Sequence, residues 1–164
     1  MGKDVVDAQY EGRRRAEVIV MAKTEASVVI YRSVEDVWKF ITDLSNLPKW
    51  DSGVLEAKQT SSGPIEVGST FLTRHRWMTY SFRCTEFEPN RRFSFEFSQG
   101  PMKGSKASVS LQTYEEKTSA TFAIDPKIGG GLKLLGPYLN RTLRGHNRES
   151  AACVKRILES EEKS

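Results

Sequence analysis

The sequence is poor in cysteine and histidine, and it lacks any long apolar run. Its 164 residues include two cysteines, Cys84 and Cys153, and two histidines. Two cysteines are too few for a disulfide framework and are typical of a reducing compartment, so we expect the protein in the cytoplasm. No segment approaches the ~18 consecutive apolar residues of a membrane span, and Val18–Met21 is shorter than the ~7–15 apolar residues of a secretory signal. We therefore expect neither a membrane span nor a signal peptide.

Motifs that mark metal, nucleotide or covalent chemistry are also missing. The histidines and cysteines lie far apart in the chain, and no Cys-x-x-Cys or His-Glu-x-x-His motif occurs, so we expect no metal site and no cofactor. Gly63–Thr70 copies the glycine spacing of a phosphate-binding loop, but Ser69 stands where such a loop needs lysine. No Gly-x-Ser-x-Gly elbow is present either. These absences argue against nucleotide binding and against serine-nucleophile catalysis.

Positive charge is concentrated toward the C-terminal end of the sequence. The chain has a formal net charge of +4, and residues 128–156 carry six lysines and arginines against a single acid, Glu149. Such a cluster can mark a nucleic-acid binder, yet the solvent face of an ordinary helix carries charges of the same kind. We expect no nucleic-acid binding. Contact of this basic segment with an acidic protein or a membrane surface stays open.

Regular periodicity begins after residue 23. We expect residues 1–23 to be an N-terminal appendage that could be disordered, and residues 24–162 to form one domain. Ala26–Ile30 alternates like a strand, and Ser33 then reads as a helix N-cap followed by apolar residues at helical spacing. This predicts a first strand followed by one or two short helices that end near Trp50.

Strand periodicity dominates from residue 54 to residue 124. Six short segments alternate apolar and polar residues, as Phe93–Phe97 does, which predicts an antiparallel meander with one apolar face. We place one tight turn at Met78-Thr79, although neither residue favours the positive φ of two-residue hairpin turns. That turn sets three facing pairs, namely Trp77 with Tyr80, His75 with Phe82, and Thr73 with Cys84.

The last segment has the pattern of a long helix. Gly129–Gly131 provides a flexible joint, and beyond it apolar residues recur at helical spacing as far as Leu158. This predicts a helix of about twenty or more residues. Pro137 interrupts the pattern early, so we expect a kink or a displaced start there.

Together these elements predict an α+β fold of the helix-grip type. A sheet with one apolar face and a helix with one apolar stripe cover each other. We expect a curved antiparallel sheet of about seven strands wrapped around the long C-terminal helix, with two short helices after the first strand. Because a curved sheet and a straight helix cannot touch everywhere, a cavity between them follows.

Scaffold motifs along the predicted domain carry a family resemblance. They are the Ser33–Trp38 helix start, the Asp43–Trp50 bend, the Val67–Ser69 strand entry, the Glu88–Phe93 turn and the glycine-rich entry into the terminal helix. In these motifs the chain resembles the polyketide cyclase/dehydrase group of the START-like (SRPBCC) superfamily, which includes birch-pollen-allergen-like and coenzyme-Q-binding proteins. The resemblance implies a helix-grip fold. It does not select a function, because the superfamily mixes lipid carriers, hormone receptors, cyclases and regulators of other proteins.

An aromatic set on the apolar face indicates a ligand site, although each ring taken alone is more simply a core residue. Ligand pockets are typically concave, mostly apolar and finished by a few polar groups. His75 is the one catalytic candidate, as a general acid or base, but no acidic partner for it is visible. Thr142 and His146 could add polar groups from the terminal helix. We expect the ligand to contact His75, Trp77, Tyr80, Phe82, Phe95, Phe97, Val109, Phe122, Leu135, Tyr138 and Leu139.

Three functional hypotheses follow. The leading one is that the protein carries or senses a small hydrophobic or amphipathic molecule in this cavity, without covalent chemistry. The alternative is a metal-free polyketide cyclase or dehydratase that uses the cavity histidine. The third is an accessory protein whose basic terminal helix docks on an acidic partner or a membrane surface. A titratable group with a perturbed pKa deep in the pocket would favour an enzyme, because a carrier needs none.

Overall fold

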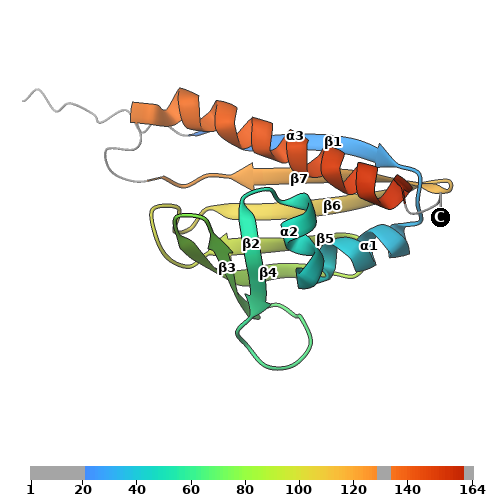
Figure 1. The fold of residues 1–164 in the computed structure, drawn as a ribbon, viewed down its shortest axis with the longest axis horizontal. Helices are drawn as coiled ribbons and strands as arrows, with labels where there is room; N and C mark the ends of the chain where they lie inside the picture. The colour runs from blue at the N-terminus through green and yellow to red at the C-terminus, as the bar shows by residue number, and fades with distance from the viewer. Residues whose placement is uncertain (1–20, 129–133, 161–164) are drawn as a thin grey trace, which may run out of the picture.

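The computed structural model describes residues 21–128 and 134–160, which Figure 1 draws in colour. Most of the expected N-terminal appendage and the Gly129–Gly131 joint lie outside these residues. Within the described ranges seven strands, three α-helices and the short 3-10 helix η1 follow one another, and residues 134–135 also have 3-10 geometry. In chain order they are β1 (Thr24–Ile30), α1 (Val34–Thr42), η1 (Leu44–Asn46), α2 (Leu47–Trp50), β2 (Val54–Gln59), β3 (Thr70–His75), β4 (Thr79–Glu88), β5 (Arg92–Phe97), β6 (Lys106–Tyr114), β7 (Lys117–Asp125) and α3 (Gly136–Ser160).

The strands form one antiparallel sheet in the order β1-β7-β6-β5-β4-β3-β2. Strands β2 to β7 are neighbours in chain order, which confirms the predicted meander, and β1 joins the sheet through β7 at the opposite edge from β2. The helices lie on one face of the sheet, with α3 along β1 and β7 (Figure 1). This arrangement is the α+β helix-grip fold that the sequence predicts.

The helical segment after β1 forms for local reasons. Ser33 caps α1 as predicted, because its Oγ accepts a hydrogen bond from the Asp36 N–H at 3.1 Å. Pro48 stands in the first turn of α2, where a missing N–H donor costs nothing. The segment ends at Trp50, as expected, and this ring is buried under the sheet.

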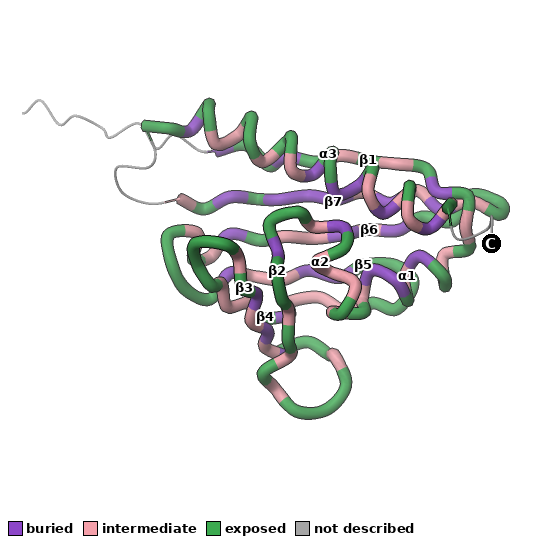
Figure 2. Tube along the Cα trace, viewed as in Figure 1, coloured by how far each residue is buried: buried purple, intermediate pink, exposed green. Residues whose placement is uncertain are grey.

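Helix α3 supplies the largest single cover of the sheet. It begins at Gly136 with Pro137 in its first turn, which confirms the displaced start. Ala151, Val154 and Leu158 are buried where the helix meets β1 and β7, and Figure 2 shows buried positions along the facing strands. Neither α3 nor any other helix in the described part of the chain is long and apolar enough to cross a membrane.

Polar contacts fix the position of α3 along β1. The buried Asn147 Nδ2 donates to both the backbone oxygen and the Oγ1 of Thr24, at 3.0 and 3.1 Å. Near the end of the helix, Arg32 Nε donates to the Leu158 carbonyl at 2.9 Å. Glu159 Oε1 accepts the backbone N–H of the first residue after β1 at 3.0 Å. These hydrogen bonds set the register of the helix against the sheet, which apolar packing alone specifies less sharply.

The hairpin between β3 and β4 differs from its prediction. Its turn is centred two residues earlier, and the N–H of His75 donates to the carbonyl of Met78 at 2.8 Å. Trp77 therefore stands at the tip of the turn, where its side chain is 85% exposed. The pairs along the two strands are Thr70 with Arg83, Phe71 with Phe82, Leu72 with Ser81, Thr73 with Tyr80, and Arg74 with Thr79.

The predicted facing pairs of this hairpin are thus wrong. Thr73 faces Tyr80 and not Cys84, which is a shift of four positions along β4. Side chains alternate between the two faces with a period of two, so an even shift leaves the same residues on each face. The hydrophobic pattern therefore cannot distinguish the two registers. The turn would have to do so, and it has no glycine or asparagine that marks its centre.

Leu158→Ala is expected to lower the free energy of unfolding by about 2–5 kcal/mol, because it opens a hole in the core beneath α3. Leu134→Ala is the matched control. That side chain is 82% exposed just before α3, so its loss should change stability by no more than about 0.5 kcal/mol. Urea denaturation followed by circular dichroism measures both values. Equal losses in the two variants would contradict the placement of α3.

Candidate functional site

A cavity of about 360 Å³ lies between the inner face of the sheet and the helices. Small-molecule sites in proteins typically measure about 300–1,000 Å³, so this space is large enough for a ligand. Strands β2 to β7, the segment from α1 to α2, and α3 all contribute to its wall. Nine aromatic side chains line it, namely Trp50, Phe71, Tyr80, Phe82, Phe87, Phe93, Phe95, Phe97 and Phe122.

The aromatic rings of the wall support one another. Phe71 and Phe95 pack edge to face with ring centroids 5.0 Å apart, and Tyr80 and Phe97 do so at 5.5 Å. Edge-to-face contacts of this kind add about 0.5–1.5 kcal/mol beyond the burial of the rings. The wall is therefore held in shape by its own packing, and it offers ring faces and edges to an apolar ligand.

His75 lies at the cavity wall with its ring nitrogens facing protein groups. Its Nε2 is 3.1 Å from Thr73 Oγ1, and its Nδ1 faces the backbone of Gly53. The ring also packs edge to face on Tyr80, with centroids 4.9 Å apart. Burial lowers the pKa of His75, and the nearby carboxylate of Asp51 only partly opposes this effect. The surroundings of His75 thus favour its neutral form, and its ring is engaged by its neighbours.

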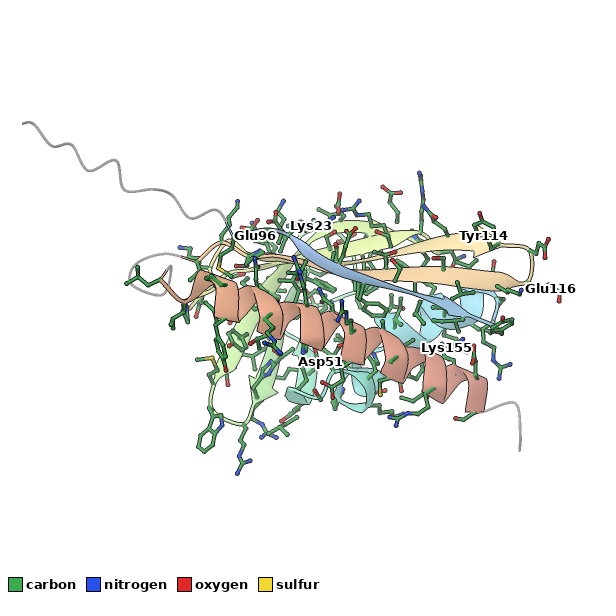
Figure 3. The ribbon with its side chains drawn as sticks, turned by 90° about the horizontal axis from the view of Figure 1, so that it is seen from above. Lys23, Asp51, Glu96, Tyr114, Glu116 and Lys155 are labelled. Atoms are coloured by element: carbon green, nitrogen blue, oxygen red, sulfur yellow. The ribbon has the colours of Figure 1, made fainter. Side chains whose placement is uncertain are left out.

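The second histidine of the chain forms an ion pair at the same end of the cavity. His146 projects from α3, and its Nε2 lies 3.4 Å from Asp51 Oδ2. The other oxygen of Asp51 accepts the Gly53 N–H at 3.1 Å, which orients the carboxylate. The hydrogen bond to Asp51 raises the pKa of His146, and burial only partly opposes it. Figure 3 shows Asp51 beside α3, on the side where the short helices lie.

Asp51 is the functional candidate that the sequence did not reveal. It directly follows α2 and is 95 positions away from His146 in the chain, so no local spacing connects the two residues. The fold brings them together because α2 and α3 both cover the cavity. The acidic partner that sequence reasoning could not find thus exists, and it is bonded to His146 and not to His75.

Seven of the predicted ligand contacts lie in the cavity wall. They are His75, Tyr80, Phe82, Phe95, Phe97, Val109 and Phe122. The two polar candidates of the terminal helix, Thr142 and His146, also line it. The structure thereby brings these residues together, and their contact with a ligand stays a prediction.

Four predicted contacts lie outside the cavity wall, which corrects their expected placement. They are Trp77, Leu135, Tyr138 and Leu139. Trp77 is exposed because the hairpin turns earlier than expected. Leu135 and Tyr138 are 50% and 69% exposed, because they stand at the start of α3, before the part of the helix that covers the cavity. Helical spacing predicted which side of α3 faces the sheet, but it did not predict that the start of α3 lies outside the part that covers the cavity.

No group of three or more histidine, cysteine or acidic side chains that could hold a metal ion occurs among the described residues. The polar groups at the end of the cavity can instead exchange hydrogen bonds and protons with a bound molecule. A protonated His146 donates, an ionised Asp51 accepts, and Thr142 can do either.

The sequence of the chain matches one protein family over residues 21–159, described as polyketide cyclase / dehydrase and lipid transport. The chain belongs to this family. The match spans every strand, the whole cavity wall and nearly all of α3. It confirms the resemblance carried by the scaffold motifs.

Solved structures share this fold at low sequence identity. XoxI from Bacillus cereus is 16% identical with a TM-score of 0.68, and the match covers 87% of this chain and 99% of that one. StfQ, a di-domain ARO/CYC from the steffimycin biosynthetic pathway, is 12% identical with a TM-score of 0.73, over 89% of this chain and 53% of StfQ. The Aha1 dimer from Colwellia psychrerythraea is 21% identical with a TM-score of 0.58, over 82% and 97% of the two chains. A search of curated proteins finds no significant match.

The two histidines of this family member are expected to titrate on opposite sides of their ordinary pKa of 6.5, His146 above it and His75 below it. Asp51→Asn should lower the pKa of His146 markedly, because it removes the carboxylate that favours the imidazolium. Proton NMR of the two ring signals against pH measures both values, and His75→Gln assigns them.

The ion pair between His146 and Asp51 also has a consequence for stability. A pKa raised on folding stabilises the fold below the unfolded value of about 6.5, and this contribution is lost as the pH rises through the folded value. The wild type should therefore have a higher free energy of unfolding than Asp51→Asn below about pH 6.5. This difference should shrink as the pH rises through the pKa of His146 in the folded protein. An unshifted His146 signal in Asp51→Asn would contradict the ion pair.

Proposed function

We propose that this protein binds a small hydrophobic or amphipathic molecule in the cavity between its sheet and α3. The observation that carries the proposal is the cavity itself, about 360 Å³ of space walled by nine aromatic side chains. Protein interiors normally pack as densely as organic crystals, and an apolar hole lowers stability. Space on this scale in an otherwise packed core is what a ligand site requires.

The distribution of polar groups suggests how the ligand is oriented. Asp51 and His146 lie at one end of the cavity, whereas Phe87 and Phe93 belong to the apolar remainder of its wall. A hydroxyl group on the ligand can donate to Asp51 and accept from His146, and a carbonyl can accept from His146. A ligand with a flat apolar body and one such neutral head group satisfies both parts of the wall.

Ala107→Phe is expected to block this site. Ala107 lies on β6 in the cavity wall, so a phenyl ring there enters the cavity and excludes the ligand. Ala152→Phe is the matched control, because Ala152 is exposed on α3 and outside the wall. Wild type and control should bind an environment-sensitive naphthalene dye saturably, with Ala107→Phe at least about tenfold weaker.

Two results would count against cavity binding. One is the absence of saturable dye or fatty-acid binding to the wild type at micromolar concentration. The other is equal dye affinity in Ala107→Phe and Ala152→Phe. If the dye binds in the cavity as expected, mass spectrometry of molecules that co-purify with the protein from its own cells would identify the natural ligand class.

A second candidate function is favoured by one specific observation, the paired and perturbed His146 at the cavity wall. A titratable group of this kind is what an enzyme needs and a carrier does not. In a cyclisation, the neutral imidazole would take a proton from the carbon between two carbonyls of a poly-ketone chain. That carbon would attack a further carbonyl of the same chain, and the oxygen of that carbonyl would receive a proton to become a hydroxyl. Loss of this hydroxyl with a neighbouring hydrogen, as water, would complete a dehydration.

This second function is tested with a linear poly-β-ketone thioester as the probe. If the protein is a cyclase, it accelerates ring formation, measured by ultraviolet absorbance and mass spectrometry. His146→Gln should then slow the reaction about 100-fold or more, a loss much larger than any accompanying loss of dye affinity. His75→Gln should retain most of the rate, because the nitrogens of His75 already face Thr73 and Gly53. No acceleration by the wild type would leave ligand binding as the function.

A further inference from the structure

Exposed apolar side chains gather at one end of the molecule. At the β3–β4 turn, Trp77 is 85% exposed and Met78 is 43% exposed. At the start of α3, Leu134, Leu135 and Tyr138 are 82%, 50% and 69% exposed. Figure 1 and Figure 3 both place this turn and the start of α3 at the same end of the molecule. Apolar surface gathered in this way marks contact with a partner or a membrane.

The same end holds the opening of the cavity. Gly53 and Thr142 line the cavity and are also exposed, so the cavity reaches the surface beside them. Trp77 lies two residues beyond the wall residue His75. Tyr138 lies one helical turn before Thr142 and on the same face of α3. The exposed apolar groups therefore continue the cavity wall outward on both sides of its opening.

Three segments at this end carry charge of one sign, and the acid at this end of the cavity, Asp51, is paired with His146. These segments are the β3–β4 turn, the β5–β6 loop and the first half of α3, which lie at the same end of the molecule (Figure 1). Residues 76–79, 98–105 and 134–148 contain no aspartate or glutamate. Their cations are Arg76, Lys103, Arg141, Arg144 and Arg148. The guanidinium carbon of Arg76 lies 5.0 Å from the centroid of the Trp77 ring, so a cation accompanies the most exposed aromatic side chain.

We propose that this end of the protein docks on an anionic lipid surface, with the cavity opening toward the bilayer. Tryptophan and tyrosine favour the level of the lipid head groups, and leucine and methionine favour the acyl region beneath. Arginines beside them are attracted to anionic lipids by about 1 kcal/mol each, which is about a fivefold gain in affinity. A hydrophobic ligand can then pass between bilayer and cavity without crossing water. The proposal goes beyond ligand binding and does not require it.

A membrane surface explains the composition of this end better than the other classes of partner. Nucleic acid would use the cations but not the exposed Leu134, Leu135 and Met78. The face of a protein partner would also bury the apolar groups, yet it would call for polar groups of both signs at its rim. Apolar side chains on segments whose charged residues are all cations match an anionic interface between oil and water.

The test is flotation of the full chain with lipid vesicles. The protein should bind vesicles of phosphatidylcholine mixed with phosphatidylglycerol, and it should bind pure phosphatidylcholine vesicles far more weakly. Added salt should weaken the binding. Trp77 should enter the interface, so tryptophan emission should shift to shorter wavelength when anionic vesicles are added. The other two tryptophans, Trp38 and Trp50, are shielded within the protein and supply a constant background.

Trp77→Ala should weaken vesicle binding at least about tenfold and abolish the emission shift. Tyr114→Ala is the matched control, because Tyr114 is 69% exposed but lies at the opposite end of the molecule (Figure 3). Arg141→Gln combined with Arg144→Gln should weaken binding to anionic vesicles about 25-fold in total, with little effect on neutral ones. All these variants change exposed side chains, and their circular dichroism should match the wild type.

Three results would overturn the docking surface. They are no preference for anionic vesicles, equal losses in Trp77→Ala and Tyr114→Ala, and self-association without lipid that Trp77→Ala removes. The last result would assign the surface to a second copy of the chain. Vesicle binding in a protein that binds no dye would support the docking surface and count against the cavity ligand. Dye binding without vesicle binding would do the reverse.

Discussion

One helix cannot cover the inner face of a curved seven-stranded sheet, and the rest of the structure follows from where that helix packs. Helix α3 lies on β1 and β7, where Val154 and Leu158 are buried. Among the aromatic residues of β3, β4 and β5, Phe87 and Phe93 pack on Trp38 of α1 instead of on α3, with ring centroids 5.3 and 5.7 Å apart. The short helices α1 and α2 approach from the side, and Trp50 of α2 packs edge to face on Phe122 of β7 at 5.7 Å. The space that remains is the cavity.

The sequence predicted the parts of this arrangement that depend on local periodicity. Alternation in Phe93–Phe97 located β5 and its inward face, and Ser33 located the start of α1. Pro137 located the displaced start of α3. Because a strand places every second residue inward, seven of the predicted contacts line the cavity without any knowledge of register. The predicted contacts that lie outside the cavity wall, such as Trp77 and Tyr138, stand near the ends of elements. There the periodicity of the sequence continues, although no other element covers the side chains.

Contacts between distant parts of the chain were beyond sequence reasoning. The pairing of β3 with β4 differs from its prediction by an even shift. Such a shift keeps every side chain on the same face, so the alternation of apolar and polar residues cannot reveal it. Asp51 meets His146 only because α2 and α3 converge over the cavity. This meeting changes the chemistry of the site, because Asp51 raises the pKa of His146 while burial lowers the pKa of His75 at the same end of the cavity. From the sequence His75 was the one catalytic candidate, whereas in the structure its ring nitrogen faces Thr73.

The anchoring of α3 along β1 is uneven, and this bears on how the fold can open. The polar contacts described between this helix and the rest of the protein run from His146 through Asn147 to Glu159. The two turns before them are mostly exposed. Helix ends with few buried contacts unfold locally at low cost, while anchored segments do not. The N-terminal turns of α3 can therefore unfold locally, which would widen the cavity beside Thr142 while the core keeps its packing.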